Sequence, residues 1–266
     1  MAVPERVVIS GAGCCTALGH DLDSVARSLR EGRDAFRASG ALEGLSVCPA
    51  EDWGQDEARQ QFEGWRHRHY LNRGSRMAVL SGLRALRDAG LEAGLPVRSQ
   101  IIAAVGPMLD VTGEPGLPPQ DTATLGALWL LRWLPNTAAG ALARFARCHG
   151  EALTVNAACA SALQALGEGW RRIRFGLADA VLVAAGDSRL SLGGLLGYHK
   201  ARALSLCAPG TGPRPFDMGR DGFVPGEGGA AFVLESLSSA QARGAHVHAE
   251  ILGYGASVDA ESLTAP

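Results

Sequence analysis

The sequence has almost no lysine and no surplus of positive charge. Lys200 is the only lysine among 266 residues, and the formal net charge is −2. A protein that binds nucleic acid through its phosphates needs a strongly basic face. This charge balance therefore argues against a general nucleic-acid binder.

Long hydrophobic runs and targeting signals are also missing. No window approaches the roughly 18 uninterrupted apolar residues of a transmembrane helix, so we expect no membrane span. Residues 1–6 lack the basic start and the apolar core of a signal peptide. We therefore expect a cytoplasmic protein with reduced thiols.

Several common kinds of site have no support. None of the six cysteines has the spacing of a metal site or a redox pair, and the chain is far too long for a disulfide scaffold. His67 with His69, and His246 with His248, lack further ligands nearby, so we expect no metal site. A Gly-x-Ser-x-Gly nucleophile turn and a phosphate loop ending in Gly-Lys-Ser/Thr are both absent, which argues against the common hydrolase and P-loop classes.

What the sequence does contain is an alternation of strand-like and helical segments. A hydrophobic content of 47% over 266 residues is enough for a substantial core. The patterns predict strands at 7–10, 101–105, 153–156, 180–184, 230–234 and 248–252, and helices at 22–30, 75–88, 122–133, 137–148, 162–175 and 238–243. This order predicts an α/β layered fold with a mostly parallel, buried sheet.

Glycine and proline mark the ends of these segments. Glycines follow five of the predicted helices, as expected of left-handed caps: Gly32, Gly90, Gly150, Gly176 and Gly244. Two stretches are rich enough in proline and glycine to predict loops, at 113–120 and 209–217.

One cysteine lies where the pattern changes from strand to helix. Residues 153–157 lead to Cys159, after which Leu163, Leu166 and Trp170 fall on one helical face. Unpaired backbone N–H groups and the positive end of a helix dipole stabilise a thiolate at such a position, so Cys159 is a candidate nucleophile. The alternative is a small buried core residue, and position alone does not separate the two.

Five stretches together resemble one enzyme family. Val155–Ala162 (VNAACASA) resembles the active-site motif of the β-ketoacyl synthases, the condensing enzymes of fatty acid and polyketide synthesis. The other four resemble the family's opening strand and glycine turn (7–13), a segment after the nucleophile (202–205), its glycine-rich stretch (214–217 with 220–229) and the segment joining its two halves (259–266). They follow family order along essentially the whole chain.

The resemblance implies the N-terminal half of a thiolase-like layered fold. Residues 1–247 would form the nucleophile domain, with a mostly parallel five-stranded sheet packed by helices. Residues 248–266 would form the first strand and the start of an incomplete C-terminal domain.

The same resemblance implies an activity. Cys159 would accept an acyl chain from the phosphopantetheine of an acyl carrier protein, for decarboxylative Claisen condensation with no further cofactor. The family's catalytic histidines and lysine lie in its second half, and none of the seven histidines here matches their motifs. We therefore expect an acyltransferase that needs a second chain or a missing half for condensation.

Three further residues match family binding positions. The stretch 66–76 is rich in arginine and histidine and has no carboxylate; a solvated helix face is the simpler explanation, but the resemblance implies contact with the acidic carrier protein. Arg66 and Arg202 match family contacts, and Tyr198 matches an aromatic residue of the acyl pocket. Family members pair through the strand before the nucleophile, which implies a homodimer or a heterodimer with another ketosynthase-like chain.

Other functions remain open at this point. The chain could be one piece of a divided ketosynthase, a fragment of a larger condensing enzyme, or a non-catalytic relative that binds carrier proteins or a ketosynthase partner. A thiolase-like acyltransferase acting on coenzyme A esters is a rival, although residues 214–229 resemble the synthases more closely.

Overall fold

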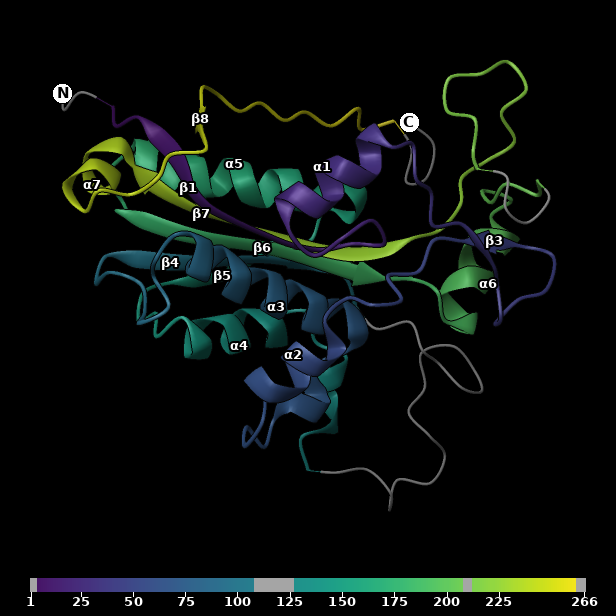
Figure 1. The fold of residues 1–266 in the computed structure, drawn as a ribbon, viewed down its shortest axis with the longest axis horizontal. Coiled ribbons are helices and arrows are strands. Elements are labelled where there is room, and N and C mark those ends of the chain that lie inside the picture. Colours follow the sequence, from purple (N-terminus) through teal and green to yellow (C-terminus); the bar gives the residue numbers. More distant parts are fainter. Residues whose placement is uncertain (1–3, 108–126, 208–211, 262–266) are drawn as a thin grey trace.

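A six-stranded sheet lies between two layers of helices (Figure 1). The computed structural model describes residues 4–107, 127–207 and 212–261. Across the sheet the strands are β5 (Ala152–Thr154), β4 (Ser99–Val105), β6 (Ala180–Ser188), β7 (Glu227–Ser236), β1 (Val7–Cys15) and β8 (Ala249–Ile251).

The directions of the strands follow from their pairing. β5, β4, β6 and β1 run one way, while β7 and β8 run against them. The predicted α/β layered fold with a mostly parallel sheet is confirmed in this sense. Five of these strands lie within residues 1–247, and β8 adds the sixth by pairing with β1.

Helices cover both faces of the sheet. α3 (Arg73–Asp88) and α4 (Thr137–Phe145) lie on one face, and α5 (Ser161–Arg174) lies on the other (Figure 1). Successive side chains of a strand point to opposite faces, and in β4 Ile101 packs with the α3 and α4 side chains while Ile102 packs with those of α5. Burial on both faces explains why the central strands are continuous apolar runs.

Smaller elements surround these layers. The helices are α1 (Leu22–Arg30), α2 (Gln55–Gln61), α6 (Leu192–Lys200) and α7 (Leu237–Ala242), and the short 3-10 turns are η1 (Arg68–Tyr70), η3 (Trp129–Arg132) and η4 (Ala158–Ala160). β2 (Arg37–Ala38) and β3 (Ser46–Val47) form a separate two-stranded sheet. Among the described residues, no helix combines the length and apolarity needed to cross a bilayer.

Most predicted elements are present, and the exceptions have local causes. The sequence missed α2, which is too polar for a hydrophobic pattern, and α6, which contains three glycines. The predicted loop at 113–120 and most of the predicted helix at 122–133 lie outside the described residues, and the end of the latter forms η3.

One of the five predicted glycine caps is wrong. Gly32, Gly90, Gly176 and Gly244 have positive φ angles, but after α4 the left-handed residue is Arg147, with φ 48°. Gly150 is needed for a different reason, because a Cβ there would lie 1.9 Å from the Ser99 carbonyl oxygen.

Candidate active site

A tight turn places Cys159 between β5 and α5. Cys159 lies in η4, and α5 begins two residues later at Ser161. The Ser161 hydroxyl accepts a hydrogen bond from Ala157 N (2.7 Å) and donates one to the Ala158 carbonyl (2.7 Å). Ala158 is held at φ 49°, where a residue with a Cβ is strained by about 1 kcal/mol. The turn is therefore fixed by local hydrogen bonds in a conformation that few sequences adopt.

The Cys159 thiol is exposed, unlike most other thiols of the chain. Burial raises the pKa of Cys14 to about 11 and also raises the pKa of Cys15, Cys48 and Cys148. These four remain protonated at neutral pH. Among the described residues, the backbone N–H of Cys159 donates to no acceptor, so it is free to bind a negatively charged oxygen of a ligand.

Cys159 and Tyr198 line the same cavity, which measures about 810 Å³. The cavity lies where β4 and β6 end, between η4, α6 and the beginning of β7. Ligands of α/β proteins commonly bind at the carboxyl ends of strands. Much of the wall consists of glycine and alanine, namely Ala104, Gly106, Ala158, Ala162, Ala185, Gly186, Gly194, Gly197, Gly228, Gly229 and Ala230.

Small residues at this end of the sheet are required by close packing. A Cβ on Gly186 would lie 2.5 Å from the Gly74 carbonyl oxygen of α3. β6 therefore packs directly on the α3 backbone at the floor of the cavity, and a larger side chain there would force the two elements apart.

Tyr198 comes from α6 and is held by an aromatic neighbour. Its ring centroid lies 5.1 Å from that of Phe223 in an edge-to-face arrangement, which is a favoured geometry for aromatic pairs. The structure thus brings the predicted nucleophile, from η4, and the predicted acyl-pocket residue, from α6, to one cavity.

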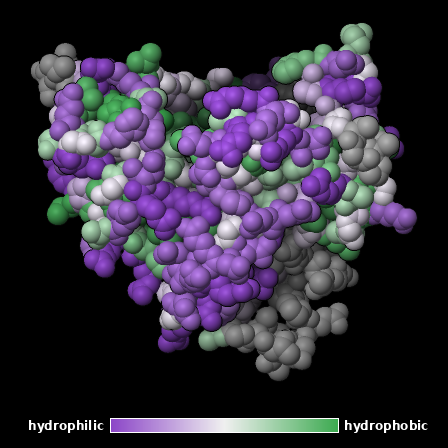
Figure 2. Space-filling model, viewed as in Figure 1, coloured by the Kyte–Doolittle hydropathy of each residue, from purple (hydrophilic) through white to green (hydrophobic). Residues whose placement is uncertain are grey.

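Arg66 and Arg202 lie outside this cavity. Both are exposed, and Arg202 follows α6 with φ 54°. Arg66 lies between α2 and η1 in the chain, and the surface in the region of α2 is mostly hydrophilic (Figure 2). The structure therefore places these two predicted carrier contacts on the surface and not beside the thiol.

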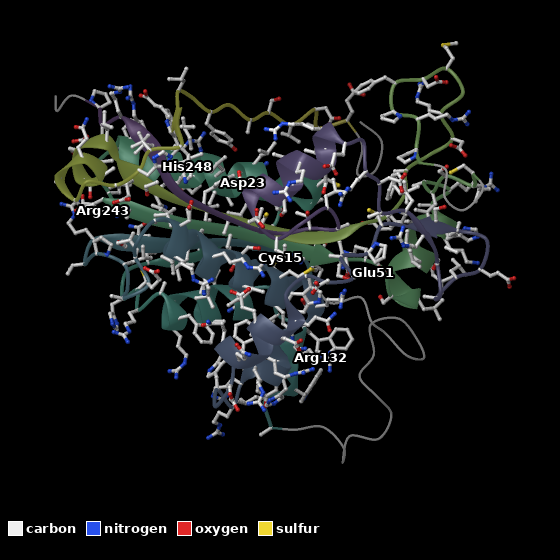
Figure 3. The ribbon with its side chains drawn as sticks, in the orientation of Figure 1. Cys15, Asp23, Glu51, Arg132, Arg243 and His248 are labelled. Atoms are coloured by element: carbon white, nitrogen blue, oxygen red, sulfur yellow. The ribbon has the colours of Figure 1, made fainter. Side chains whose placement is uncertain are left out.

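A cluster of arginines surrounds Arg76, which belongs to the same stretch of sequence as Arg66. Burial and the positive charges of Arg132, Arg68 and Arg73 lower the pKa of Arg76. Figure 3 labels Arg132 on the α3 side of the sheet. Like charges at this density make the surface attractive to anionic partners.

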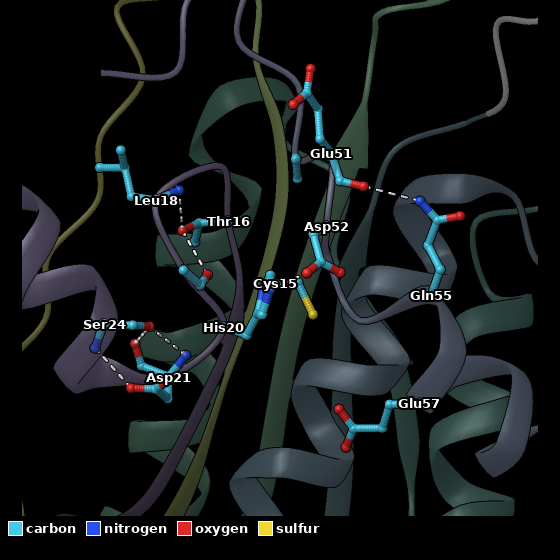
Figure 4. Close-up of polar contacts among 12 residues, drawn as sticks. Cys15, Thr16, Leu18, His20, Asp21, Ser24, Glu51, Asp52, Gln55 and Glu57 are labelled. Atoms are coloured by element: carbon cyan, nitrogen blue, oxygen red, sulfur yellow. Dashed lines mark hydrogen bonds and ion pairs between the residues drawn. The ribbon is translucent and has the colours of Figure 1, made fainter. Parts of the chain in front are cut away.

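Sequence reasoning missed three further residues of the cavity, Thr16, Asp187 and Arg189. The Thr16 hydroxyl donates to the Gly19 carbonyl (3.0 Å) and accepts from Leu18 N (3.1 Å), which closes the turn after β1 (Figure 4). Asp187 and Arg189 follow the apolar core of β6. Their position at the end of a buried parallel strand was the available signal.

A buried carboxylate links three of the elements near the cavity. The Glu227 side chain is 1% exposed and binds Arg73 through two contacts of 2.6 Å. It also accepts from the Ser188 hydroxyl (2.7 Å) and from Ala50 N (3.0 Å). One charged group thus joins the start of β7, the end of β6 and the start of α3. Within the described ranges, no group of histidine, cysteine and acidic residues could hold a metal ion.

Comparisons with known proteins all indicate the same enzyme family. A family model described as "Beta-ketoacyl synthase, N-terminal domain" matches residues 4–240. The chain is 30% identical to the putative mitochondrial 3-oxoacyl-[acyl-carrier-protein] synthase of Schizosaccharomyces pombe, over 98% of this chain and 66% of the relative.

Solved structures give the same result. The β-ketoacyl synthase from Burkholderia phymatum STM815 superimposes with a TM-score of 0.81 at 29% identity, covering 98% of this chain and 66% of the other. The ishigamide ketosynthase/chain length factor does so with a TM-score of 0.78 at 28% identity, covering 97% and 65%. The chain therefore spans slightly less than two thirds of the length of these relatives.

Proposed function

Because the chain belongs to the β-ketoacyl synthase family, we propose that Cys159 accepts an acyl chain from the phosphopantetheine thioester of an acyl carrier protein. The observation that carries this proposal is the exposed Cys159 thiol, on a constrained turn, at the wall of a cavity of about 810 Å³.

The residues of the turn support acyl transfer. The Cys159 sulfur, as thiolate, attacks the thioester carbonyl carbon; a new carbon–sulfur bond forms, the donor carbon–sulfur bond breaks, and the donor leaves as a thiol with the proton that Cys159 gave up. The Cys159 N–H donates to the oxyanion of the tetrahedral intermediate. Ala158 and Ala162 beside the sulfur leave room for the acyl group.

Condensation needs more than this cavity contains. Among the described residues that line it there is no histidine and no lysine. A second thioester, normally malonyl, must lose carbon dioxide before its carbanion attacks the acyl-cysteine. We propose that the catalytic histidines and lysine come from a second chain or from a longer form of this one.

The proposed partner is an acidic carrier protein that binds at Arg66 and Arg202. Both side chains are exposed, and the arginine cluster around Arg76, in the same stretch of sequence as Arg66, favours an anionic partner. Complementary charge of this kind speeds encounter and sets orientation. The proposed assembly is a homodimer or a heterodimer with a ketosynthase-like chain through β5, which lies at one edge of the sheet.

The test measures the intact mass of the chain after incubation with an acyl-carrier thioester. We expect the mass of the wild-type chain to increase by that of the acyl group, and we expect Cys159→Ala to abolish the increase. Cys48→Ala, which removes a half-buried thiol, is the matched control and should retain it. A wild-type chain that gains no mass would instead support the second candidate, a non-catalytic binding partner. Faster transfer from coenzyme A than from the carrier would favour a thiolase-like acyltransferase.

A further inference from the structure

An ion pair forms part of the wall of the Cys159 cavity. Arg189 Nε donates to Asp187 Oδ2 (2.9 Å), and Arg189 Nη1 donates to the Pro107 carbonyl (2.7 Å). All three residues line the cavity. The pair thus connects the end of β4 to the end of β6 and places charge in a wall otherwise rich in glycine and alanine.

The guanidinium is largely buried but incompletely paired. The Arg189 side chain is 13% exposed. A guanidinium carries five N–H donors, and within the described part of the chain only two of them meet an acceptor. Polar hydrogens buried without a partner are costly, so a ligand oxygen that accepts from them would be stabilised.

Gly106 fixes the position of Arg189 Nη2, the guanidinium nitrogen that meets no acceptor among the described residues. A Cβ on Gly106 would lie 2.1 Å from Arg189 Nη2, which means that the guanidinium packs directly on the glycine backbone. Gly106 lines the cavity as well. Nη2 is therefore held at the wall of the cavity that Cys159 also lines.

From this geometry we infer that Arg189 makes the cavity select acyl chains bearing a neutral carbonyl oxygen over saturated alkyl chains. The inference rests on the proposed function of Cys159 and names its substrate class. Asp187 already neutralises the Arg189 charge, so a neutral keto oxygen fits better than a carboxylate, which Asp187 would repel. A saturated chain against the pair would remove water from charged groups without replacing their hydrogen bonds.

The experiment compares matched thioesters in the acylation of Cys159. N-Acetylcysteamine thioesters of 5-oxohexanoate and 7-oxooctanoate are measured against those of hexanoate and octanoate, with rates taken from intact mass. The keto group is remote from the thioester, so intrinsic reactivity is matched. We expect at least one oxo-acyl donor to react about tenfold faster than its alkyl counterpart, which is the discrimination that one hydrogen bond to a charged donor supports.

Two variants and a control assign the preference to Arg189. Arg189→Met should abolish it, and Arg189→Lys, which retains one donor group, should keep part of it. Arg59→Met should leave it unchanged, since Arg59 is 81% exposed and its cation is outside the cavity.

The outcomes separate the inference from the proposed function. Equal wild-type rates for oxo-acyl and alkyl donors would overturn the inference alone, as would an unchanged ratio in Arg189→Met. Failure of every donor to acylate Cys159, the acyl-carrier thioester included, would overturn both. If Arg189→Met does not fold, Arg189→Lys takes its place, and a wild-type ratio that Arg189→Lys leaves unreduced would overturn the inference.

Discussion

Cys159 differs from the other cysteines of the chain in its exposure to solvent. Its thiol is exposed, while Cys14 and Cys15 lie in the core beside Arg84, whose Nη1 is 3.1 Å from the Cys15 sulfur. A nearby cation favours a thiolate, yet burial is the larger effect and raises the pKa of Cys15. Location in the fold, and not the presence of a cation, therefore separates the exposed thiol of Cys159 from the buried thiols with raised pKa values.

This contrast predicts the order of alkylation. With a pKa of about 11, roughly one Cys14 side chain in a thousand is a thiolate at pH 8. We expect iodoacetamide at pH 8 to modify Cys159 before Cys14, Cys15, Cys48 and Cys148, as mapped by peptide mass spectrometry. Denaturation in urea should remove the difference. Equal labelling of Cys14 and Cys159 in the folded chain would contradict the structure.

A second residue-scale prediction concerns the buried carboxylate of Glu235. Its side chain is 0% exposed and binds Arg243 Nε at 3.0 Å as well as the Ser10 hydroxyl (Figure 3 labels Arg243). Arg243→Met would leave a buried charge without its partner, which typically costs about 3–5 kcal/mol. We expect the free energy of unfolding in urea to fall by that amount.

Arg59→Met is the matched control for this change. Arg59 pairs with Asp56 at 3.2 Å, but both side chains are more than four-fifths exposed, at 81% and 88%. Exposed pairs contribute little, so stability should hardly change. Equal changes in the free energy of unfolding of the two variants would contradict the predicted difference between the buried and the exposed pair.

At the scale of elements, α1 owes its beginning to two side chains. Asp21 accepts from Ser24 N (2.8 Å), and the Ser24 hydroxyl accepts from Asp21 N (3.3 Å), forming a capping box (Figure 4). The Ser24 backbone N–H, followed by its hydroxyl, lowers the pKa of Asp21. The capping interaction is therefore strongest when Asp21 is ionised.

Asp21→Ala should destabilise the chain by about 1 kcal/mol at pH 7. Because the folded pKa of Asp21 is depressed, its stabilisation is complete above the unfolded value of about 3.9 and is lost as the pH falls through the folded value. The difference in unfolding free energy between wild type and Asp21→Ala should therefore be constant above pH 5 and shrink in acid. Glu43→Ala, at an exposed site, should show no such dependence.

How far the sequence predicts each element depends on what buries it. β4, β6 and α3 are packed in the core, so their hydrophobic patterns predicted the first residue of each element to within two residues. The end of β6 was missed by four residues, because Gly186, Asp187 and Ser188 break the apolar run although they pair with β7. Pairing with a partner strand depends on residues far away in the sequence, so the local hydrophobic pattern does not predict it.

The same distinction applies to the site. Cys159 was identifiable because a local change from strand to helix marks it, and Tyr198 because the family motif does. Arg189 has neither of these two signals, and its position after a buried strand does not show which residues it meets. Its place in the cavity depends on Pro107 and Gly106, about eighty residues away, which only the folded sheet brings together.

At the scale of the whole molecule, the two edges of the sheet differ in how they are covered. β8 ends one edge, and residues 252–261 run on from it; Tyr254 packs against Gly167 and under Arg171 of α5. β5 ends the other edge with three residues, and Ala152 is exposed there. An open edge strand is a template for pairing with another chain.

The proposed dimer through β5 predicts opposite results at these two edges. In a two-fold antiparallel pairing of β5 with its copy, Ala152→Lys would bring two ammonium groups close together, and like charges opposite each other destabilise strand pairs. We expect sedimentation equilibrium to show self-association of the wild type, weakened at least tenfold by Ala152→Lys. Ala249→Lys is the matched control, because Ala249 is also an exposed alanine, on β8 at the far edge. A monomeric wild type, or equal weakening by both variants, would place the contact between chains elsewhere than β5.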